Sequence, residues 1–342
     1  MPTATVRLAP PPGAAHQLRD ALGEVDRRFG PGVAITPDNQ PPPAVISTGS
    51  LTLDHALGIG GIPTGRLTEV YGPEGAGKTT LTLSVIARAQ QAGGTACFVD
   101  AEHALNLAWA ATVGISLERL VLCRPDCGEQ ALEVASLLIG SGGLDVLVID
   151  SIAALVPKAE LDGEMGEQFP GVQANLLSQA LRKLAGPIAR AGTAVLVTNQ
   201  LRQRAGTPGT PVYTTGGRAL GYYASIRLDL RPLEHLKDGG RVVGSRIRVQ
   251  VTKNKLAPAW QSAELELLSD RGVLGEAGLL DPGVAAGLVT RSGGWYAYDG
   301  CQLGQGRAQA GRFLAEHPDL AGELEGRLRV HLGLSVPEAA SA

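Results

Sequence analysis

The chain has 342 residues, of which 44% are hydrophobic, 18% charged and 4% aromatic, and this composition is typical of a globular α/β protein with one large and one smaller core. Its formal net charge of −3 excludes nucleic-acid binding driven by the field of the whole protein, so any such binding must use local basic loops. No apolar run approaches the ~20 residues of a membrane span, and the segment after Met1 lacks the form of a secretory signal, so we expect a cytoplasmic protein with no membrane partner.

The beginning of the chain predicts a helix on a tether. Residues 1–12 end in a proline cluster and are expected to be disordered, whereas residues 30–43 are rich in proline, which disfavours both helix and central strand. Between them, residues 15–29 carry apolar side chains at helical spacing, namely Leu18, Leu22, Val25 and Phe29. We expect an amphipathic helix that docks on its own core or on that of a neighbour.

Residues 72–79 read Gly-Pro-Glu-Gly-Ala-Gly-Lys-Thr, a complete G-x-x-x-x-G-K-[ST] phosphate loop between a strand-like run and a helix-like run. The glycines let backbone N–H groups curl round a β-phosphate, and the helix N-terminus adds a favourable dipole. We expect Lys78 to meet the β- and γ-phosphate oxygens and Thr79 to offer its hydroxyl to Mg²⁺. A glycine-rich turn before a helix is the alternative. The residues assigned to ATP binding here are Gly72, Pro73, Glu74, Gly75, Ala76, Gly77, Lys78, Thr79 and Thr80.

Beyond the phosphate loop the chain alternates between strand-like and helical runs as far as about residue 268. The clearest strands are expected at 66–71, 95–100, 144–150 and 193–199. This alternation predicts an α/β fold with a mainly parallel sheet covered by helices. From about residue 274 shorter, glycine-punctuated segments and two helical stretches, at 308–316 and 320–332, predict a small α+β C-terminal domain.

Polar residues end several of these strands, and in parallel sheets ligands bind beyond the carboxyl ends of the strands. Asp150 has the place expected of a carboxylate that orders Mg²⁺ or its waters. Glu102 is a candidate general base that polarises a water against the γ-phosphate, and Asp100 is either linked to the metal or a turn former. Gln200 brings an amide that can hydrogen-bond a γ-phosphate and report its loss. A helix-capping Asp and a surface Gln are the alternatives for Asp150 and Gln200.

The phosphate loop, the run Asp-Ala-Glu-His-Ala-Leu at 100–105, the strand that ends at Asp150 and the pair Asn199-Gln200 together resemble the bacterial RecA recombinase family. The resemblance covers roughly residues 45–332 with several motifs in order, which is more specific than a phosphate loop alone. Further matching segments are 178–184, 214–217, 223–225, 253–255 and 304–306.

The resemblance implies a RecA-like P-loop NTPase that forms filaments on single-stranded DNA and catalyses homologous pairing and strand exchange. ATP hydrolysis would be stimulated by DNA and would serve DNA repair and SOS induction. Its implied partners are single-stranded DNA, homologous double-stranded DNA, further copies of itself in a helical filament and a repressor of the LexA type, and its cofactors are ATP and Mg²⁺. Lys253 and Lys255 would reach the nucleotide of the adjacent subunit and stabilise transition-state charge.

The resemblance also assigns the nucleobase and DNA contacts. Trp109 lies where the family places an aromatic ring over adenine, and Asn106 where it places a polar contact to the base; a buried core Trp is the competing interpretation. Residues 161–173 and 201–215 occupy the positions of the two DNA-facing loops, although solvated loops without function would look similar. The implied DNA contacts are Ser178, Arg182, Arg202, Arg204, Gly216 and Gly217, of which the arginines after Gln200 could present cations to a DNA backbone.

The sequence is therefore expected to divide into four parts. Residues 1–44 hold a tail, a polymerisation-type helix and a proline-rich tether, residues 45–272 the ATPase core, residues 273–333 a small domain and residues 334–342 a disordered tail. Gly75 and Ala76 replace two serines usual in the family, Asn175 a usual arginine and Gly221 a common lysine. Two alternatives accompany the recombinase: a hexameric helicase or other motor, and a filament that acts mainly as a scaffold or co-protease with weak strand exchange.

Overall fold

The computed structural model describes residues 14–30, 33–34, 43–202, 213–273 and 275–334. They belong to two compact units, Met1–Pro42 and Pro43–Ala342. In the first unit, α1 (Ala14–Phe29) confirms the predicted N-terminal helix, and Leu18 and Phe29 expose 63% and 68% of their surface. The expected disordered start, most of the tether and the tail beyond residue 334 lie outside the described residues. Within the described ranges, no helix combines the length and apolar character needed to cross a membrane.

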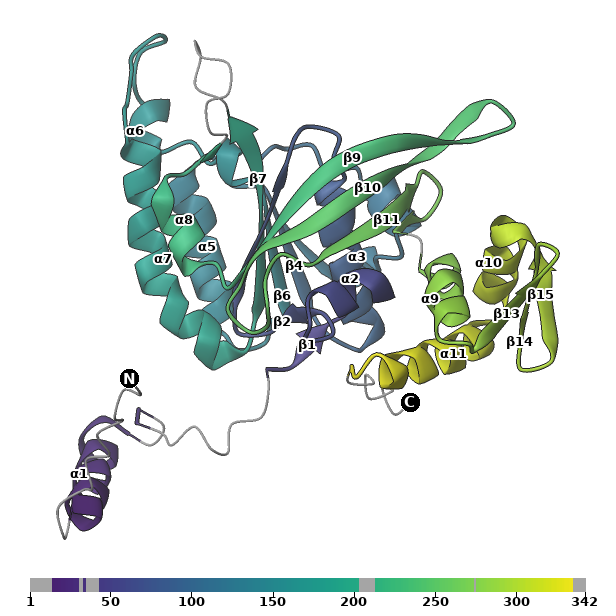
Figure 1. Ribbon diagram of the computed structural model, residues 1–342. Coiled ribbons are helices and arrows are strands. Elements are labelled where there is room, and N and C mark those ends of the chain that lie inside the picture. Colours follow the sequence, from purple (N-terminus) through teal and green to yellow (C-terminus); the bar gives the residue numbers. More distant parts are fainter. Residues whose placement is uncertain (1–13, 31–32, 35–42, 203–212, 274, 335–342) are drawn as a thin grey trace, which may run out of the picture. The chain divides into compact units, whose positions relative to one another are not determined.

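One large sheet forms the centre of the second unit, with strand order β12-β11-β10-β9-β3-β7-β6-β4-β5 and with β8 paired to β7 (Figure 1). The six neighbours from β9 to β5 run parallel, which confirms the predicted mainly parallel sheet. The expected strands appear within two residues of their predicted starts. The parallel strands are β3 (Leu67–Gly72), β4 (Ala96–Asp100), β5 (Leu120–Cys123), β6 (Val146–Asp150), β7 (Ala194–Arg202) and β9 (Ile226–Asp238).

Helices cover both faces of this sheet. The core on one face joins α2 (Leu51–Ala56) and α3 (Lys78–Gln91) to the strands, and the core on the other joins α5 (Gly128–Gly140) and α7 (Val172–Ala191). Because strand side chains alternate between faces, buried strands covered on both sides read as continuous apolar runs. The shorter helical pieces of this region are α4 (Leu107–Thr112), η2 (Leu117–Arg119), η3 (Ile152–Ala154), α6 (Lys158–Leu161) and α8 (Arg218–Tyr223).

Antiparallel strands extend the sheet on one side. β9 and β10 (Arg241–Asn254) form a long hairpin, which Figure 1 shows projecting beyond the neighbouring strands. β11 (Ser262–Leu268) and β12 (Gly272–Val273) complete this edge, so the expected domain boundary between residues 272 and 273 falls within β12. The remaining short strands are β1 (Val45–Ile46) and β2 (Ile62–Pro63), which pair with each other, and β8 (Tyr213–Thr214).

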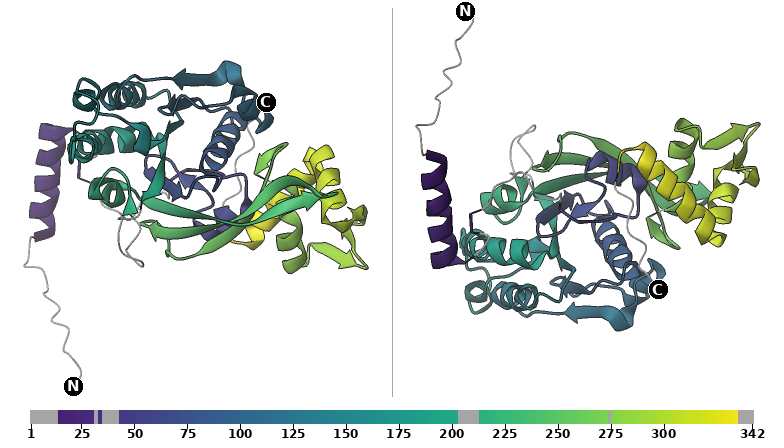
Figure 2. Two further views of the ribbon diagram at one scale, coloured as in Figure 1. Left: turned by 90° about the horizontal axis from the view of Figure 1, so that it is seen from above. Right: turned by 90° about the horizontal axis from the view of Figure 1, so that it is seen from below.

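After residue 275 the chain builds a smaller three-stranded antiparallel sheet with helices around its own core (Figure 2). Leu51 of α2 also belongs to this core, so α2 contributes to two cores. The two predicted helices near the C-terminus are confirmed as α10 and α11. The elements are η4 (Glu276–Leu279), α9 (Leu280–Ala285), β13 (Val289–Ser292), β14 (Trp295–Tyr298), β15 (Cys301–Gln305), α10 (Gly306–Glu316) and α11 (Pro318–His331).

A buried ion pair joins α11 to the ATPase core. Arg329 is 1% exposed and donates from Nη2 to Asp54 Oδ2 of α2 at 2.6 Å. Asp54, fully buried, also accepts from Ser47 Oγ, Thr48 N and Thr48 Oγ1 at 2.6, 2.8 and 2.7 Å. The Arg329 Nε donates to Glu325 at 2.9 Å. Arg329 also donates to Ser47 Oγ at 3.2 Å and to the backbone oxygen of Gly60 at 3.4 Å. The charges of Asp54 and Arg329 are therefore satisfied by each other, by Glu325 and by the residues around α2.

Candidate functional site

The phosphate loop leaves β3 and enters α3 through three glycines with distinct constraints. Gly75 and Gly77 have φ of 70° and 82°, in the left-handed region that favours glycine. A Cβ on Gly77 would collide with Leu267 Cδ1, and a Cβ on Gly72 would collide with the carbonyl oxygen of Leu230. Steric demand therefore fixes glycine at both ends of the loop, and the curled backbone fits the cradle that a triphosphate requires.

Lys78 stands at the first turn of α3, where the backbone N–H groups of a helix lack intrahelical partners. Its Nζ donates to the carbonyl oxygens of Gly72 and Pro73 at 3.2 and 2.8 Å. Burial lowers the pKa of Lys78, while the charges of Asp150 and Glu102 act in the opposite direction. The ammonium thus lies in the mouth of the loop with carboxylates nearby, as a phosphate-binding cation should.

Asp150 ends β6 and is 8% exposed. Thr79 Oγ1 donates to its Oδ2 at 2.6 Å, and Thr198 Oγ1 donates to its Oδ1. Burial raises the pKa of Asp150, and the two hydroxyl hydrogen bonds act against that rise. The fold therefore brings together the two residues that the sequence assigned to Mg²⁺, and a hydroxyl with a carboxylate beside a phosphate loop is a donor set that suits this ion.

The two acidic residues after β4 have different surroundings. Glu102 is exposed and accepts from Ser151 Oγ at 2.5 Å, so the residue that follows Asp150 fixes its carboxylate. Asp100 is 2% exposed and accepts from the backbone N–H groups of Ala104 and Leu105 at 3.0 and 3.2 Å. Its carboxylate therefore orders the turn after β4, whereas Glu102 faces the edge of the sheet where Asp150 ends.

Gln200 lies beside the start of the phosphate loop because β7 and β3 pair in parallel, with Gln200 opposite Gly72. The side chain is exposed, and its backbone N–H donates to Asn199 Oδ1 at 2.9 Å. An amide at this position is at the carboxyl ends of the strands, together with Glu102 and Asp150. The sheet thus brings the predicted water-activating, metal-linked and γ-phosphate-sensing residues to one edge.

Trp109 and Asn106 belong to α4. Trp109 is half-buried and packs against the core that holds α3, and it lines a cavity of about 380 Å³ together with Gly75, Gly77 and Thr80 of the phosphate loop. Asn106 caps α4, and its Oδ1 accepts the backbone N–H of Trp109 at 3.0 Å. Trp109 therefore has both a packed side and a side toward the nucleotide region.

The two lysines bind the end of a helix instead of the phosphate loop of their own chain. Lys253 Nζ donates to Gly221 O and Tyr222 O at 2.6 and 3.2 Å, and Lys255 Nζ donates to Tyr222 O at 3.0 Å. These carbonyls belong to the last turn of α8, where cations are favoured. Among the described residues, no hydrogen bond or ion pair joins either lysine to the phosphate loop.

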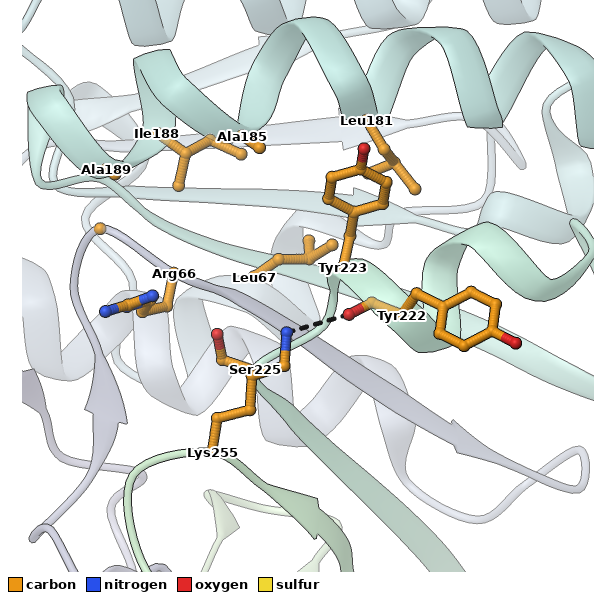
Figure 3. A pocket seen from close by; sticks show the side chains of 11 residues that line it. Arg66, Leu67, Leu181, Ala185, Ile188, Ala189, Tyr222, Tyr223, Ser225 and Lys255 are labelled. Atoms are coloured by element: carbon orange, nitrogen blue, oxygen red, sulfur yellow. Dashed lines mark hydrogen bonds between the residues drawn. The ribbon is translucent and has the colours of Figure 1, made fainter.

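Lys255 also lines a groove of about 480 Å³ between α7 and α8. In Figure 3 the Lys255 side chain rises beside Tyr222, to whose carbonyl it is joined by the dashed line, and helix α7 forms the opposite wall. Tyr222 exposes 69% of its surface. The groove that Lys255 lines is therefore open to solvent at Tyr222.

Four of the six predicted DNA contacts lie on or beside α7, namely Ser178, Arg182, Gly216 and Gly217. Ser178 is half-buried and Arg182 exposed on this helix. Gly216 has φ of 89°, and a Cβ there would lie 2.6 Å from Leu177 Cδ1, while a Cβ on Gly217 would lie 2.9 Å from Ala174 Cβ. Arg202 ends β7 with a side chain outside the described part, and Arg204 lies outside the described residues altogether.

Sequence reasoning missed the residues that hold the site together. Thr198 and Ser151 contact Asp150 and Glu102, and both adjoin motif residues in the chain, so a hydroxyl next to a strand-ending polar residue was the available signal. Glu69, inside a fully buried strand, was also missed. A carboxylate in an otherwise apolar strand was its signal, since buried charges need partners.

Comparison with known proteins agrees with this geometry. The family model described as the RecA N-terminal domain matches residues 16–274, and the one described as the RecA C-terminal domain matches residues 277–333. The chain is 51% identical over 320 residues to Protein RecA of Frankia alni, which covers 93% of this chain and 92% of that protein. It is 52% identical over 329 residues to Protein RecA of Streptomyces venezuelae, covering 95% and 87%, and 50% identical over 326 residues to Protein RecA of Mycolicibacterium gilvum, covering 94% and 93%.

Both family models, and about 50% identity over nearly the full length of the chain, confirm the resemblance that the motifs indicated. The match continues through the C-terminal region, which disfavours a helicase that shares only the core. The chain therefore belongs to the RecA family and is a DNA-dependent ATPase and recombinase of DNA repair.

Proposed function

We propose that this recombinase hydrolyses ATP at the edge of the sheet where Lys78, Thr79, Glu102, Asp150 and Gln200 meet, and only when an adjacent subunit supplies Lys253 and Lys255. The observation that carries the proposal is the hydrogen-bonded arrangement of Thr79 with Asp150 and of Ser151 with Glu102 at one edge. The lysines of the same chain instead face α8 at an open surface, which supports a role toward a second subunit.

In this mechanism the loop from Gly72 to Thr80 surrounds the phosphates and cradles them through its backbone N–H groups, which Pro73 lacks. Lys78 moves from the loop carbonyls to the β- and γ-phosphate oxygens. Thr79 and Asp150 would hold Mg²⁺, which when bound neutralises charge on the phosphate oxygens. Asp100 supports this site indirectly, through the turn that carries Glu102. Burial raises the pKa of Asp150, and the hydrogen bonds from Thr198 and Thr79 and the charge of Lys78 act against that rise.

Glu102, oriented by Ser151, accepts a proton from the water that attacks the γ-phosphate. Gln200 hydrogen-bonds the γ-phosphate and responds to its loss. Lys253 and Lys255 of the adjacent subunit stabilise the charge that develops on the transferred phosphoryl group. Trp109 covers the adenine and Asn106 contacts its edge, and the cavity that joins Trp109 to the phosphate loop supports this.

The protein works on single-stranded and double-stranded DNA and assembles with itself, as its family does. The finer assignments are part of the proposal: DNA contacts from Ser178, Arg182, Arg202, Arg204, Gly216 and Gly217 in and beside the loops 161–173 and 201–215, a LexA-type repressor as regulatory partner, and a cytoplasmic location. Exposed Leu18 and Phe29 on α1 support the docking of residues 1–44 on a neighbour.

We also propose the division into a core at 45–272 and a small domain at 273–333, supported by the core that the C-terminal elements build, to which α2 adds Leu51. A filament that acts mainly as a scaffold or co-protease is not favoured over the recombinase by the relatives. Gly221, at the end of α8, offers its carbonyl to Lys253, so its difference from the family's usual lysine lies within the proposed subunit contact.

The test measures ATP hydrolysis with and without single-stranded DNA at low and moderate salt. Wild-type protein should be stimulated by DNA, and less so as salt rises. Lys78→Ala should lose ATP binding, whereas Glu102→Gln should keep binding and filaments but hydrolyse slowly. Mixing Lys253→Ala with Lys78→Ala should restore part of the activity, because each supplies what the other lacks. Undiminished hydrolysis by Glu102→Gln, or no recovery in any mixture, would overturn these assignments.

A further inference from the structure

Glu69 is a carboxylate in the middle of β3, and it is fully buried. It pairs in register with Val197 of β7 on one side and with Arg227 of β9 on the other, and Arg227 pairs in turn with Lys253 of β10. Glu69 therefore lies between the strand that carries Gln200 and the strand that carries Lys253. A buried carboxylate at such a place must be explained by its partners.

Both oxygens of Glu69 are used, each by a different neighbouring strand. Oε1 accepts from Asn199 Nδ2 at 2.9 Å, and Oε2 accepts from Arg227 Nε at 2.5 Å. Asn199 is fully buried, whereas the Arg227 side chain is 25% exposed. We call Glu69, Asn199 and Arg227 the Glu69 junction. Its charge-assisted hydrogen bonds fix the two flanking strands relative to β3.

On the β7 side the junction reaches the residues that follow the phosphate-sensing amide. Asn199 Oδ1 accepts the backbone N–H of Gln200 at 2.9 Å, and the same amide donates from Nδ2 to Thr215 O at 2.9 Å. Arg227 Nη2 donates to Thr214 Oγ1 at 3.3 Å. Hydrogen bonds therefore join the Gln200 backbone to Thr215 through Asn199, and to Thr214 through Asn199, Glu69 and Arg227.

On the β10 side the junction reaches Lys253. The Arg227 guanidinium lies 4.7 Å from the centre of the Tyr71 ring, and Tyr71 OH lies 2.9 Å from Thr252 Oγ1, which donates to the backbone oxygen of Arg227 at 3.2 Å. Burial lowers the pKa of the adjacent Lys253; the Lys255 and Arg227 charges act in the same direction, and the Glu69 charge opposes them. The charges of the junction are thus felt at the lysine.

We propose that Glu69 is a positioning residue that links two nucleotide sites: the Glu69 junction holds Gln200 of β7 and Lys253 of β10 in one arrangement, so that a subunit's contact with its own γ-phosphate sets the position of the lysine it offers to its neighbour. This inference rests on the proposed roles of Gln200 and Lys253 and extends them to communication along a filament. The physical link is a chain of hydrogen bonds across four adjacent strands, β7, β3, β9 and β10, which ends at Thr252, the residue before Lys253.

The experiment is a double-mutant cycle on DNA-stimulated hydrolysis, using Glu69→Gln, Lys253→Ala and the combined variant of the full chain. Gln at position 69 keeps an acceptor for Asn199 but removes the charge that holds Arg227. We expect Glu69→Gln to lower the DNA-stimulated kcat by about tenfold, as loss of a hydrogen bond to a charged group would, with ATP affinity changed by less than about twofold. In the Lys253→Ala background Glu69→Gln should lower the DNA-stimulated kcat little further, because the lysine that Glu69 positions is already absent.

Two controls separate positioning from folding. Asp54→Asn disturbs a second carboxylate–arginine pair, in which the carboxylate is as buried as Glu69, and should lower stability without changing the ratio of stimulated to unstimulated hydrolysis. Arg227→Lys keeps the positive charge but loses the forked contacts with Glu69 and Thr214, so it tests the junction if Glu69→Gln fails to fold. Its DNA-stimulated kcat should fall as that of Glu69→Gln does.

Losses that multiply in the combined variant, or full stimulated activity in both Glu69→Gln and Arg227→Lys, would overturn the positioning role while leaving the proposed function intact. Full stimulated activity in Lys253→Ala alone would instead overturn the proposed role of that lysine, and the inference with it.

Discussion

Two buried carboxylate–arginine pairs in this recombinase have the same chemistry and different surroundings. Asp54 and Glu69 are both fully buried. Asp54 and Arg329 use their remaining hydrogen bonds on Ser47, Thr48 and Gly60 beside α2 and on the helix that carries Arg329. Glu69 and Arg227 instead reach Asn199, Thr214 and, through register, Lys253.

The difference lies in where the spare hydrogen-bonding capacity of each pair goes. A buried ion pair is by itself weak evidence for stability, because desolvation offsets the Coulomb attraction. When the other hydrogen bonds of the pair go to residues next to it, as around Asp54, the pair fixes how two elements pack. When they lead to strands that carry the proposed sensor and cation, as around Glu69, the same pair can transmit a displacement.

The largest effect is expected at Asp54. Asp54→Ala leaves Arg329, 1% exposed, without its buried carboxylate and with only Glu325 of its own helix as an anionic partner, and should lower the free energy of unfolding by about 3–5 kcal/mol, as breaking a buried pair does. Chemical denaturation of the full chain measures this loss. At a temperature where the variant is folded, DNA stimulation should be retained; a variant that is stable but no longer stimulated would remove the contrast between the two pairs.

Glu69→Gln should be less destabilising. The Arg227 side chain is 25% exposed and can be hydrated when its partner loses charge, so we expect a loss of about 1.5–3 kcal/mol. Chemical denaturation of Glu69→Gln beside wild type measures this loss. A loss equal to that of Asp54→Ala would mean that the Glu69 pair is as closed as the other and serves packing alone.

Asn199→Ala removes the donor to Glu69 and Thr215 and the acceptor of the Gln200 N–H. Because Asn199 and Glu69 are fully buried, the substitution leaves a buried acceptor without its donor, and the free energy of unfolding should fall by about 1–2 kcal/mol. The DNA-stimulated kcat should nevertheless fall severalfold, and steady-state hydrolysis of the purified variant measures it. Thr193→Val, just before β7, is the matched control, since its buried hydroxyl donates to the backbone oxygen of Leu144 instead. Equal stimulation in Asn199→Ala and wild type would contradict transmission through β7.

The smallest effect is expected at an exposed pair. Arg248 and Glu264 lie 3.0 Å apart on the antiparallel strands, with side chains 52% and 50% exposed. A double-mutant cycle to alanine should give a coupling energy of about 0.2–1 kcal/mol that decreases with salt. A coupling energy as large as that of either buried pair would show that burial does not determine how strongly the three ion pairs are coupled.

Much of the fold was predictable because its signals are local. Buried parallel strands read as apolar runs, and the phosphate loop has a fixed spacing, so β3, β4, β6 and β7 and the edge that carries Asp150 and Glu102 followed from the sequence. The helix at 14–29 followed from its apolar period. These features depend on a few neighbouring residues.

The partners of buried polar groups were not predictable, because they join residues far apart in the chain. Glu69 meets Asn199 across 130 residues and Arg227 across 158, and no spacing rule connects such positions. Asp100 carried two interpretations, and only the backbone contacts of Ala104 and Leu105 distinguish its surroundings from those of Asp150. The sequence offered the weaker signal that a charge inside an apolar strand needs a partner.

The position of Arg329 near the end of the chain has a consequence for synthesis. Asp54 and Arg329 are 275 residues apart, an interval that a ribosome covers in roughly 15–55 s at ordinary elongation rates. Throughout that time the carboxylate on α2 has no cation to receive it. A nascent core should therefore stay open at α2 until α11 emerges, and a chain that terminates before Arg329 should have an incomplete ATPase core in addition to a missing helix.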